Sequence, residues 1–331
     1  MSLEFPYFNQ TNDWATFWES ANPSTPHTTY FFENEFVGCY VYQYPLAGGV
    51  FSKLKFWYIP RAFIIKKQLD SSDLSVQTNN LLDIIKAKAA TQNIVLIKLD
   101  LGLDFQQWPD TRSDLTNSAK KLQYLSTNIL NLNNLESCIS IEDFWTKNKS
   151  WFEASFDKRT RYGTRKALDY GWKFSTEKSS DNFEKFYKLH FDTANRQGFG
   201  LHSYDYLAAF YKQNFSRVII LRDADNVVQA GWLGAAINYS LINLYGGNSL
   251  VSRDNYGQYF LHLIALWQAV NQELSTYDLG GMELGKGFDL FKQGYKGSKV
   301  EFLGPFDIIL KPRLHNLYLL TKSLKDKFSK R

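Results

Sequence analysis

The 331-residue chain has few of the residues that build metal centres and disulfide frameworks. It contains two cysteines and two methionines, and its five histidines show no HxxxH spacing. Cys39 and Cys138 have no metal or redox spacing, so each is expected to be a semi-buried thiol. The chain also lacks a G-x-S-x-G elbow and a Walker-type loop, which leaves hydrolase and kinase functions without support. We therefore expect neither a metal nor a bound cofactor.

Long hydrophobic runs are missing as well. The most apolar stretch, 230–244, is interrupted by Asn238, Ser240 and Asn243, and it does not predict a membrane span. The first ten residues lack the basic and apolar regions of a signal peptide. We expect a cytoplasmic protein without an integral membrane segment. The net charge of +5 permits anionic partners without requiring them.

Aromatic residues, in contrast, are abundant: 26 Phe, 20 Tyr and 9 Trp. So many tyrosines cannot all be core residues, because each buried hydroxyl needs a partner, and some are expected to line a polar cleft. The length is that of about two domains. Helical and strand patterns alternate along the chain, which predicts an α/β (α+β) fold. Helices are expected at 13–19, 81–90, 151–170, 182–197, 204–215 and 259–273, and strands at 30–37, 38–44, 56–61, 93–99, 218–221, 228–236, 241–246, 276–279, 300–303 and 307–310.

A glycine-rich stretch near the end organises this interpretation. Residues 278–297, DLGGMELGKGFDLFKQGYKG, hold six glycines around Phe291 and Lys292. Glycine lets the backbone approach a ligand closely or adopt a positive φ at low cost. On spacing alone, a surface loop with a solvated lysine and a lysine that points into a cleft both remain open.

The order YD-x-G-G, F-D-x-F-K-x-G-Y-x-G and E-F-x-G-P-F-D resembles the C-terminal signature of the Fem-type aminoacyltransferases. These enzymes add amino acids to peptidoglycan precursors with aminoacyl-tRNA as the donor. The resemblance implies that Phe291 and Lys292 form the catalytic pair, with the lysine stabilising the negative charge that develops during transfer. Tyr295 takes the second aromatic position, as a substrate contact, and Gly297 stands one residue from the glycine of the motif.

The resemblance covers most of the chain. FWYIPRAF (56–63) is similar to the family's Y-I-P-R-G-P, which makes Arg61 a candidate substrate contact, with Ala62 where glycine is usual. IVLIKLDLGLD (94–104) and FDKRTRYGTRKALDYGWKF (156–174) resemble two further segments. The family implies two tandem GNAT-like acyltransferase domains. We expect the first at 1–148, with 311–331 packing back on it, and the second at 149–310, carrying the Phe-Lys motif, without the helical arm of longer relatives.

A basic segment lies in the second half. Lys158, Arg159, Arg161, Arg165 and Lys166 place five cations in nine residues. On a helix, residues three and four apart share a face. The segment is either a solvated helix face or a phosphate-binding surface. The resemblance favours contact of Lys158, Arg161 and Arg165 with tRNA or with the precursor's phosphates.

Arg196 is expected at a helix C-terminus, where a cation is favoured by the helix dipole. Capping alone explains its presence. In Fem-type enzymes an arginine near this place, with tyrosines after it, contacts the nucleotide-sugar precursor. The resemblance therefore makes Arg196, Tyr204, Tyr206 and Tyr245 candidate substrate contacts.

The segment 253–259 bears on the acyl donor. A CoA-dependent acetyltransferase needs a pyrophosphate loop of the form Q/R-x-x-G-x-G/A before its long helix. In residues 253–259 the distance from Arg253 to Gly257 is one residue longer than in that loop. Tyr259 replaces the small residue that lets phosphate reach the helix N-terminus. This speaks against CoA and for a larger donor.

The resemblance, with these features beside it, implies transfer of an amino acid from aminoacyl-tRNA to an amine of a nucleotide-sugar or lipid-linked peptidoglycan precursor. Two alternatives remain. One is a GNAT-type N-acyltransferase that acts on an amino sugar of a surface polysaccharide with an acyl-CoA or acyl-carrier donor. The other is a non-catalytic binding module, against which the Phe291–Lys292 pair speaks.

Overall fold

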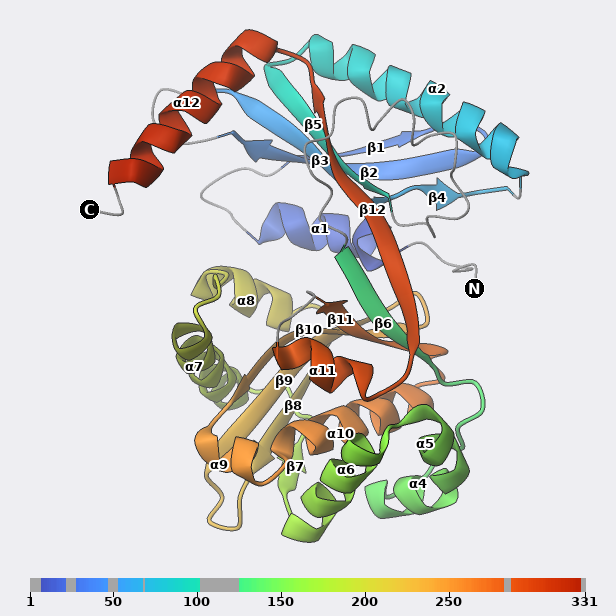
Figure 1. Ribbon diagram of the computed structural model, residues 1–331, viewed down its shortest axis with the longest axis vertical. Helices are drawn as coiled ribbons and strands as arrows, with labels where there is room; N and C mark the ends of the chain where they lie inside the picture. The colour runs from blue at the N-terminus through green and yellow to red at the C-terminus, as the bar shows by residue number, and fades with distance from the viewer. Residues whose placement is uncertain are drawn as a thin grey trace. The chain divides into compact units, whose positions relative to one another are not determined.

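The computed structural model describes residues 7–21, 28–46, 53–67, 69–101, 125–282 and 287–328. The chain divides into two compact units. The first consists of Met1–Leu125 and Glu301–Arg331, and the second of Ser126–Val300. Each unit is a β-sheet with helices packed on its faces (Figure 1).

The first unit has a five-stranded path, β1-β2-β3-β5-β12, with β4 paired to β2. Only the β3–β5 pair is parallel among the registered pairs of this sheet. Its elements are η1 (Phe8–Gln10), α1 (Asn12–Ser20), β1 (Thr28–Glu33), β2 (Val37–Pro45), β3 (Lys55–Ala62), β4 (Ile64–Ile65), α2 (Ser71–Ala90), β5 (Ile94–Leu101), β12 (Ser298–Ile309, which begins in the second unit) and α12 (Pro312–Phe328).

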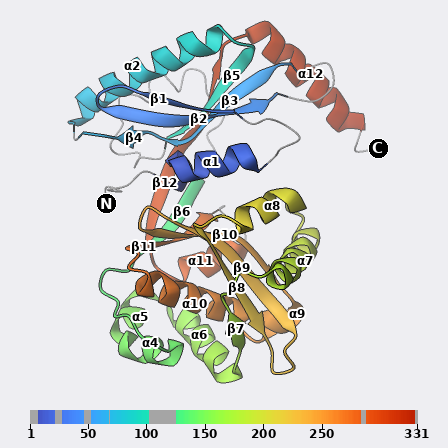
Figure 2. The same cartoon turned by 180° about the vertical axis from the view of Figure 1, so that it is seen from behind.

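The core of the first unit lies between α2 and the sheet. α2 begins after Asp70, whose carboxylate accepts a hydrogen bond from the Asp73 amide at 2.8 Å. Leu81 and Ile85 of α2 are fully buried against Trp57 and Ile97 of the sheet. α1 covers the opposite face (Figure 2). This burial on both faces explains why β5 is a nearly continuous apolar run.

The second unit has the strand order β6-β11-β10-β9-β8-β7. The β10–β11 pair is parallel, and the other registered pairs of this sheet are antiparallel. Its elements are β6 (Leu125–Asn131), α4 (Ile141–Lys147), α5 (Lys149–Ser155), α6 (Lys158–Tyr170), β7 (Lys173–Ser175), α7 (Ser180–Gln197), α8 (Tyr204–Tyr211), β8 (Ser216–Arg222), β9 (Val228–Ile237), β10 (Ser240–Asn248), α9 (Leu250–Asp254), α10 (Gly257–Asn271), β11 (Thr276–Met282) and α11 (Gly287–Gln293).

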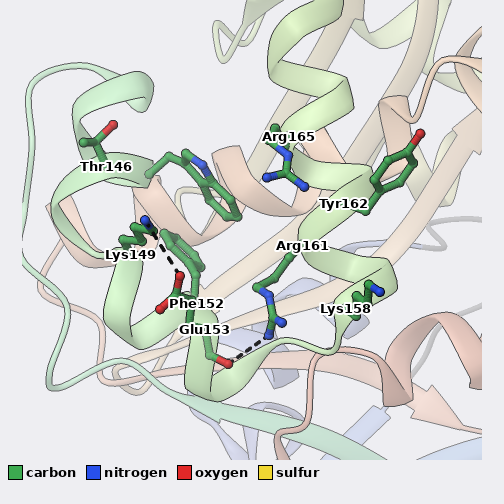
Figure 3. A pocket seen from close by; sticks show the side chains of 9 residues that line it. Thr146, Lys149, Phe152, Glu153, Lys158, Arg161, Tyr162 and Arg165 are labelled. Atoms are coloured by element: carbon green, nitrogen blue, oxygen red, sulfur yellow. Dashed lines mark hydrogen bonds and ion pairs between the residues drawn. The ribbon is translucent and has the colours of Figure 1, made fainter.

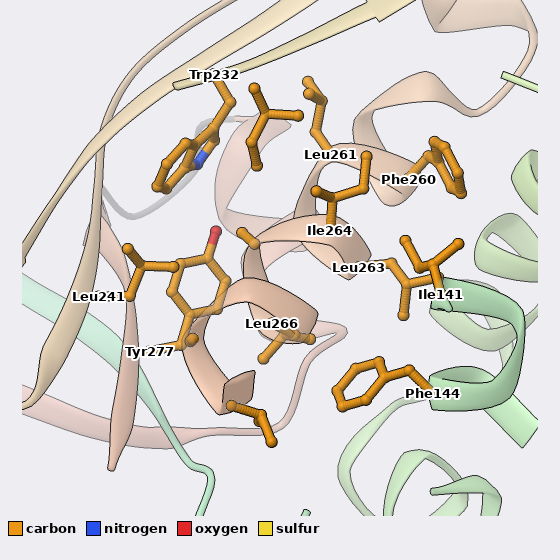
Figure 4. Packing of buried hydrophobic residues seen from close by; sticks show 14 of the residues in the cluster. Ile141, Phe144, Trp232, Leu241, Phe260, Leu261, Leu263, Ile264, Leu266 and Tyr277 are labelled. Carbon is orange, nitrogen blue, oxygen red and sulfur yellow. The ribbon is translucent and has the colours of Figure 1, made fainter. Parts of the chain in front are cut away.

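Helix α10 forms the centre of the second core. Leu261 and Ile264 are fully buried against Trp232 of β9 and Tyr277 of β11 (Figure 4). Helices α4, α5 and α6 complete this face of the sheet, and α7 packs on the other face, against β9 and β10. A helix that is apolar all round, as α10 is, belongs inside the protein because every one of its faces meets another element.

Several elements differ from the sequence expectation. Helix α2 begins at Ser71, ten residues before the expected start, and α8 ends at Tyr211, four residues before the expected end. Strands β6 and β7 and helices α4 and α9 were not expected.

The single helix expected at 151–170 is divided into α5 and α6 at Phe156, whose backbone is extended. Asp157 then caps α6 by accepting a hydrogen bond from the Thr160 amide at 2.6 Å. The two strands expected at 300–303 and 307–310 are one strand, β12, with a register shift between Leu303 and Phe306. Within the described residues, no helix is both long and apolar enough to cross a membrane.

Candidate active site

The Phe291–Lys292 pair lies on α11, which packs beside β11 (Figure 1). The Lys292 ammonium donates a hydrogen bond to the carbonyl oxygen of Gly281 at 2.7 Å. It also lies 5.3 Å from the centre of the Phe288 ring. The lysine side chain is half-buried. Lys292 is therefore held at a defined place beside the end of β11, within the glycine-rich frame formed by residues 278–297.

One glycine of the frame is required by the backbone. Gly280 has a φ of +79°, and a Cβ atom there would lie 2.6 Å from the carbonyl oxygen of Asn243. The same Cβ would lie 3.6 Å from the Lys292 ammonium nitrogen. Gly281, in contrast, has no atom within 4 Å of the position that its Cβ would take. Gly280 is thus required by its positive φ and by the nearby Asn243 carbonyl, whereas 3.6 Å from the lysine nitrogen would be an ordinary contact.

Burial lowers the pKa of Lys292 to about 8, and the carboxylates of Asp278 and Asp289 oppose this shift. Both carboxylates are buried, with 2% of each residue exposed. Asp278 accepts hydrogen bonds from the Thr127 hydroxyl and from the Gly280 amide, the latter at 2.7 Å. The lysine is therefore mostly cationic at neutral pH, although it is drier than a surface lysine.

Phe291 anchors α11 to the core. Its ring lies 5.0 Å from the Tyr259 ring and 5.3 Å from the rings of His262 and Tyr295. Tyr295, expected as a substrate contact, is itself only 1% exposed and packs on Phe156 at 4.8 Å. This aromatic cluster fixes the position of α11 and, with it, the direction of Lys292.

A chain of polar side chains runs beneath Phe291. The Tyr277 hydroxyl and His262 Nδ1 are 2.6 Å apart, and His262 Nε2 is 3.3 Å from the Gln258 amide. Gln258 accepts a hydrogen bond from the Asn248 amide at 3.2 Å, and Arg196 donates to the Asn248 carbonyl oxygen at 3.0 Å. Burial, together with the positive charge of Lys292, lowers the pKa of His262 to about 3, so the imidazole is neutral.

Arg196 is the exposed end of this chain and lies in the last turn of α7, as expected. Tyr206 and Tyr245 lie close together: Tyr206 is hydrogen-bonded to Tyr245, and His202 stacks on Tyr206 at 4.2 Å. Burial raises the pKa of Tyr245 to about 12. Tyr204 is separate from this pair, because its hydroxyl donates to Glu184 of α7.

The basic segment occupies α6, and its arginines have different partners. Arg161 donates to the carbonyl oxygens of Glu153 and Phe156 at 2.9 and 2.6 Å, which satisfies the end of α5. Arg159 donates to the carbonyl oxygen of Leu290 on α11 at 2.6 Å. Within the described residues, Lys158 and Arg165 have neither a hydrogen-bond partner nor an ion-pair partner.

Arg61 belongs to a second polar cluster, in the first unit. Its guanidinium lies 3.8 Å from the Asp100 carboxylate and 5.7 Å from the centre of the Tyr7 ring. Asp100 is 2% exposed and also accepts a hydrogen bond from the Tyr58 hydroxyl. Burial raises the pKa of Asp100, although Tyr58 and Arg61 act in the opposite direction.

The sequence matches the model of the FemAB family over residues 114–221 and 212–323. The chain belongs to the FemAB family. A search among curated proteins gave no match. Among the described residues, no group of three or more histidine, cysteine, aspartate or glutamate side chains is arranged to hold a metal ion.

The fold of this FemAB chain is similar to that of FemX, with a TM-score of 0.71 at 17% identity over 96% of this chain and 95% of the FemX chain. It is also similar to the C-terminal domain of a putative lysylphosphatidylglycerol synthetase from Agrobacterium fabrum, with a TM-score of 0.54 at 11% identity and coverages of 95% and 92%. A conserved protein of unknown function from Bacteroides thetaiotaomicron gives a TM-score of 0.53 at 12% identity, with coverages of 93% and 93%. The expected α/β fold in two tandem domains is confirmed.

Several residues of the FemAB site were not expected from the sequence. Thr127 and Asn128 come from β6, and Asn128 donates to the Lys292 carbonyl oxygen at 2.7 Å. A Cβ atom at Gly297 would lie 2.2 Å from the Asn128 amide oxygen, which accounts for the glycine there. Asp100, in the first unit, was also not expected; it lies next to the last residue of β5, and its lone carboxylate near the end of an apolar run is the signal that could have indicated it.

Proposed function

We propose that this FemAB protein transfers an amino acid from aminoacyl-tRNA to an amine of a peptidoglycan precursor peptide. Membership of the FemAB family supports the coarser statement that the chain is a transferase. The observation that carries the proposal is the half-buried Lys292 cation, held on α11 at the end of β11 by its hydrogen bond to Gly281.

The reaction needs little activation, because an ester is already a reactive acyl donor. The lone pair of the acceptor amine attacks the ester carbonyl carbon, and a C–N bond forms. The tetrahedral intermediate then collapses, the C–O bond to the ribose breaks, and the ribose hydroxyl leaves with a proton released by the amine. The enzyme mainly has to orient both reactants and stabilise the oxyanion.

Lys292 is the residue that we assign to the oxyanion. In partly dry surroundings a charge interaction is stronger than in water. The pKa of about 8 leaves the lysine mostly protonated at neutral pH, and the buried Asp278 and Asp289 keep it from falling further. Phe291 serves this role indirectly, through its contacts with Tyr259, His262 and Tyr295.

The start of α10 supports a donor other than CoA. A Cβ atom at Gly163 of α6 would lie 2.7 Å from the Tyr259 ring, and the same ring contacts Phe291. The Tyr259 side chain is thus packed between α6 and α11. A Cβ atom at Gly257 would lie 2.3 Å from the Ser252 hydroxyl, so the preceding turn is filled as well. A pyrophosphate needs open amides at this helix N-terminus, and here side chains occupy the space.

For the acceptor, we propose contacts with Arg196, Tyr204, Tyr206 and Tyr245 of the second unit. Arg61, in the first unit, is proposed separately as a substrate contact. Arg196 is exposed and cationic, which suits the phosphates of a nucleotide-sugar or lipid-linked precursor. Tyr245 is half-buried, and Tyr206, with 4% exposed, is proposed to act through its hydrogen bond to Tyr245. Because Tyr295 is buried, we propose that it serves the site as a support for Phe291 and α11.

The test supplies purified protein with tRNA charged with labelled amino acids and with a nucleotide-linked precursor that carries a free lysine amine. We expect the acceptor to gain the mass of one amino-acid residue. A lipid-linked precursor in detergent tests the second form of the acceptor, and acetyl-CoA is the competing donor. An acetyl gain from acetyl-CoA, without any response to charged tRNA, would overturn the proposal in favour of the N-acyltransferase alternative.

A further inference from the structure

A hydrogen-bonded chain of side chains crosses the second unit from its surface to its core. Arg196 donates to the Asn248 amide oxygen at 3.2 Å, and the Asn248 amide nitrogen donates to the Gln258 amide oxygen at 3.2 Å. The Gln258 amide nitrogen lies 3.3 Å from His262 Nε2, and His262 Nδ1 lies 2.6 Å from the Tyr277 hydroxyl. The chain thus joins α7, β10, α10 and β11. The transfer chemistry described above gives His262 no role.

The direction of each hydrogen bond in this chain follows from its outer end. A guanidinium has only donors, so the Asn248 side chain turns its oxygen towards Arg196 and its NH2 group towards Gln258. Gln258 then uses its oxygen for Asn248 and presents its own NH2 group to His262. This NH2 group needs an acceptor, so His262 Nε2 carries no proton. Burial lowers the pKa of His262 to about 3, so the imidazole is neutral and its one proton lies on Nδ1, towards Tyr277.

Arg161 of α6 is a useful comparison, because its hydrogen bonds end on the backbone. Its guanidinium donates to the carbonyl oxygens of Glu153 and Phe156 at 2.9 and 2.6 Å, and Figure 3 shows the first of these bonds. A backbone carbonyl oxygen cannot exchange its acceptor for a donor, so Arg161 orients no further side chain. Arg196 differs because one of its partners is a side-chain amide, which carries the order of donors and acceptors inwards.

The inner end of the chain lies against the candidate active site. The centre of the His262 ring is 5.3 Å from that of Phe291 and 5.4 Å from that of Tyr295, and His262 is 1% exposed. Phe291 directly precedes Lys292 on α11. An imidazole that is hydrogen-bonded at both nitrogens is held in one orientation, whereas an apolar side chain would be held by packing alone. Phe291 therefore packs on a ring whose orientation is fixed.

The same order of donors keeps a second cation away from Lys292. A proton on His262 Nε2 would face the NH2 group of Gln258, and two donors cannot pair. The positive charge of Lys292 also disfavours an imidazolium at this place. Asp278 on β11 and Asp289 on α11 are the carboxylates that favour the protonated form of Lys292. His262 on α10, being neutral, adds no competing charge.

We propose that His262 is a positioning residue for the transfer reaction, an imidazole protonated on Nδ1 that fixes Phe291 and, through it, Lys292. Its tautomer is set from the surface by Arg196, through the two side-chain amides. The link to transfer rests on the proposed function, whereas the tautomer and its effect on Lys292 do not. His262 acts on the chemistry through the position of α11.

The first test determines the tautomer by NMR. Long-range proton–nitrogen correlation spectra of protein with labelled histidine distinguish protonated from unprotonated ring nitrogens, and we expect the proton of His262 on Nδ1. Asn248→Asp replaces the NH2 group with an acceptor, so Gln258 should turn its own NH2 group towards the new carboxylate and its oxygen towards His262. The proton of His262 should then move to Nε2. Asn214→Asp changes an exposed asparagine of the same unit and, as the matched control, should leave the proton on Nδ1.

Arg196→Met tests whether the surface sets this order. Without a donor-only group at the outer end, both directions of the chain pair its inner amides, so a measurable fraction of His262 should carry its proton on Nε2. Arg161→Met is the matched control, because the bonds of Arg161 end on backbone oxygens, and the tautomer should not change. A proton on Nε2 in the parent protein, or one that stays on Nδ1 in both Asn248→Asp and Arg196→Met, would overturn the proposal.

A second measurement tests positioning. His262→Leu keeps an apolar side chain but removes both ring nitrogens, so we expect Lys292 to move towards solvent and its pKa to rise from about 8 towards 10.5. Carbon NMR of lysine labelled at Cε follows this titration, and Lys292→Met assigns the signal. Gln258→Leu frees only one ring nitrogen, and as the milder second variant it should shift the pKa in the same direction. A purely structural role of His262 would lower the melting temperature but leave the pKa of Lys292 in the folded protein unchanged, which would overturn the proposal.

The transfer assay keeps this proposal apart from the proposed function. In His262→Leu the single-turnover rate of transfer from aminoacyl-tRNA should fall about 10-fold, because the charge at the oxyanion is misplaced. Acceptor affinity should change less, since Lys292 acts chiefly in the transition state. Transfer at the parent's rate in folded His262→Leu would overturn the positioning role and leave the proposed function intact. A parent protein with the expected tautomer and pKa shift that transfers no amino acid would overturn the proposed function and leave the effect of His262 on Lys292 intact.

Discussion

The two units place a cation near buried carboxylates in contrasting ways. In the first unit the Arg61 guanidinium lies 3.8 Å from Asp100, so its charge is largely used within the protein. In the second unit Lys292 lies in the field of Asp278 and Asp289, but its hydrogen bond goes to a neutral backbone carbonyl. The positive charge of Lys292 is therefore mostly available to interact with a substrate. From this contrast we propose that Arg61 stabilises the first unit in addition to its proposed substrate contact, whereas the charge of Lys292 acts mainly on the substrate.

The largest expected effect is that of Lys292→Met on turnover. Methionine keeps most of the length and the apolar contacts while it removes the charge. We expect the single-turnover rate of aminoacyl transfer to fall by roughly 10²–10³-fold, the usual cost of losing one oxyanion donor. Acceptor affinity should change much less, because the interaction exists chiefly in the transition state.

The same variant should not lose stability, since it removes a cation that burial disfavours. Thermal melting of the purified variant checks this point. A folded Lys292→Met protein with the parent's transfer rate would show that the lysine is not part of the chemistry.

Arg61→Met should show the opposite pattern. It leaves Asp100 buried without its cation, and breaking a buried pair costs about 3–5 kcal/mol of folding free energy. Because 3.8 Å is long for an ion pair and the Tyr58 hydroxyl remains, we expect the lower end of that range, about 3 kcal/mol. Urea unfolding followed by tryptophan fluorescence measures the change.

The double variant Arg61→Met/Asp100→Asn is the control for this pair. Removing the carboxylate charge together with the cation should recover about half of the lost free energy, since no buried charge is left unpaired. If the two single changes simply add in the double variant, the pair does not interact, and the contrast between the two units fails.

Much of the fold could be predicted because periodicity and burial follow each other closely. The alternating and apolar runs predicted most strands of both sheets, although not β4, β6 or β7, and the resemblance predicted two GNAT-like domains. The break between α5 and α6 was not predicted, because helical periodicity continues across it. The decisive feature is Asp157, whose carboxylate caps α6, and an N-cap is stronger evidence for a helix start than periodicity is for continuity.

Of the candidate site, the sequence indicated Lys292 and Phe291 but not their surroundings. Thr127 and Asn128 are ordinary strand residues until β6 pairs with β11 and brings them beside Asp278 and α11. No local pattern encodes such a contact, because the partners are more than 150 residues apart. The hydrogen bond from Arg161 to the end of α5 could not be predicted either, because it depends on the break between α5 and α6.

A smaller effect is expected from Gly280→Ala, which tests whether the frame around Lys292 is required. The positive φ of +79° and the carbonyl of Asn243 at 2.6 Å from the added Cβ both oppose alanine. We expect a loss of about 1–3 kcal/mol in folding free energy, the usual cost of a strained backbone conformation, together with slower transfer as Lys292 is displaced. Gly281→Ala is the matched control, because nothing lies within 4 Å of its Cβ. Equal stability losses in the two variants, measured by urea unfolding, would remove the special role of Gly280.

The smallest effect concerns pH, and here the two units should differ in sign. The pKa of Lys292 is lowered to about 8 from 10.5, so between these values the unfolded chain binds more protons than the folded one. Stability relative to Lys292→Met should therefore be lowest below pH 8 and should rise as pH increases from about 8 towards 10.5.

The pKa of Asp100 is raised above 3.8, so just above that value the folded chain binds more protons than the unfolded chain. The contribution of Asp100 to stability should therefore fall as pH rises through this window. Melting temperatures of the parent, Lys292→Met and Asp100→Asn proteins across pH measure both trends, which should amount to no more than a few degrees. A parent-minus-Lys292→Met difference that stays flat above pH 8 would mean that the lysine is not desolvated, and the distinction between a cation used for structure and one kept for the substrate would lose its physical basis.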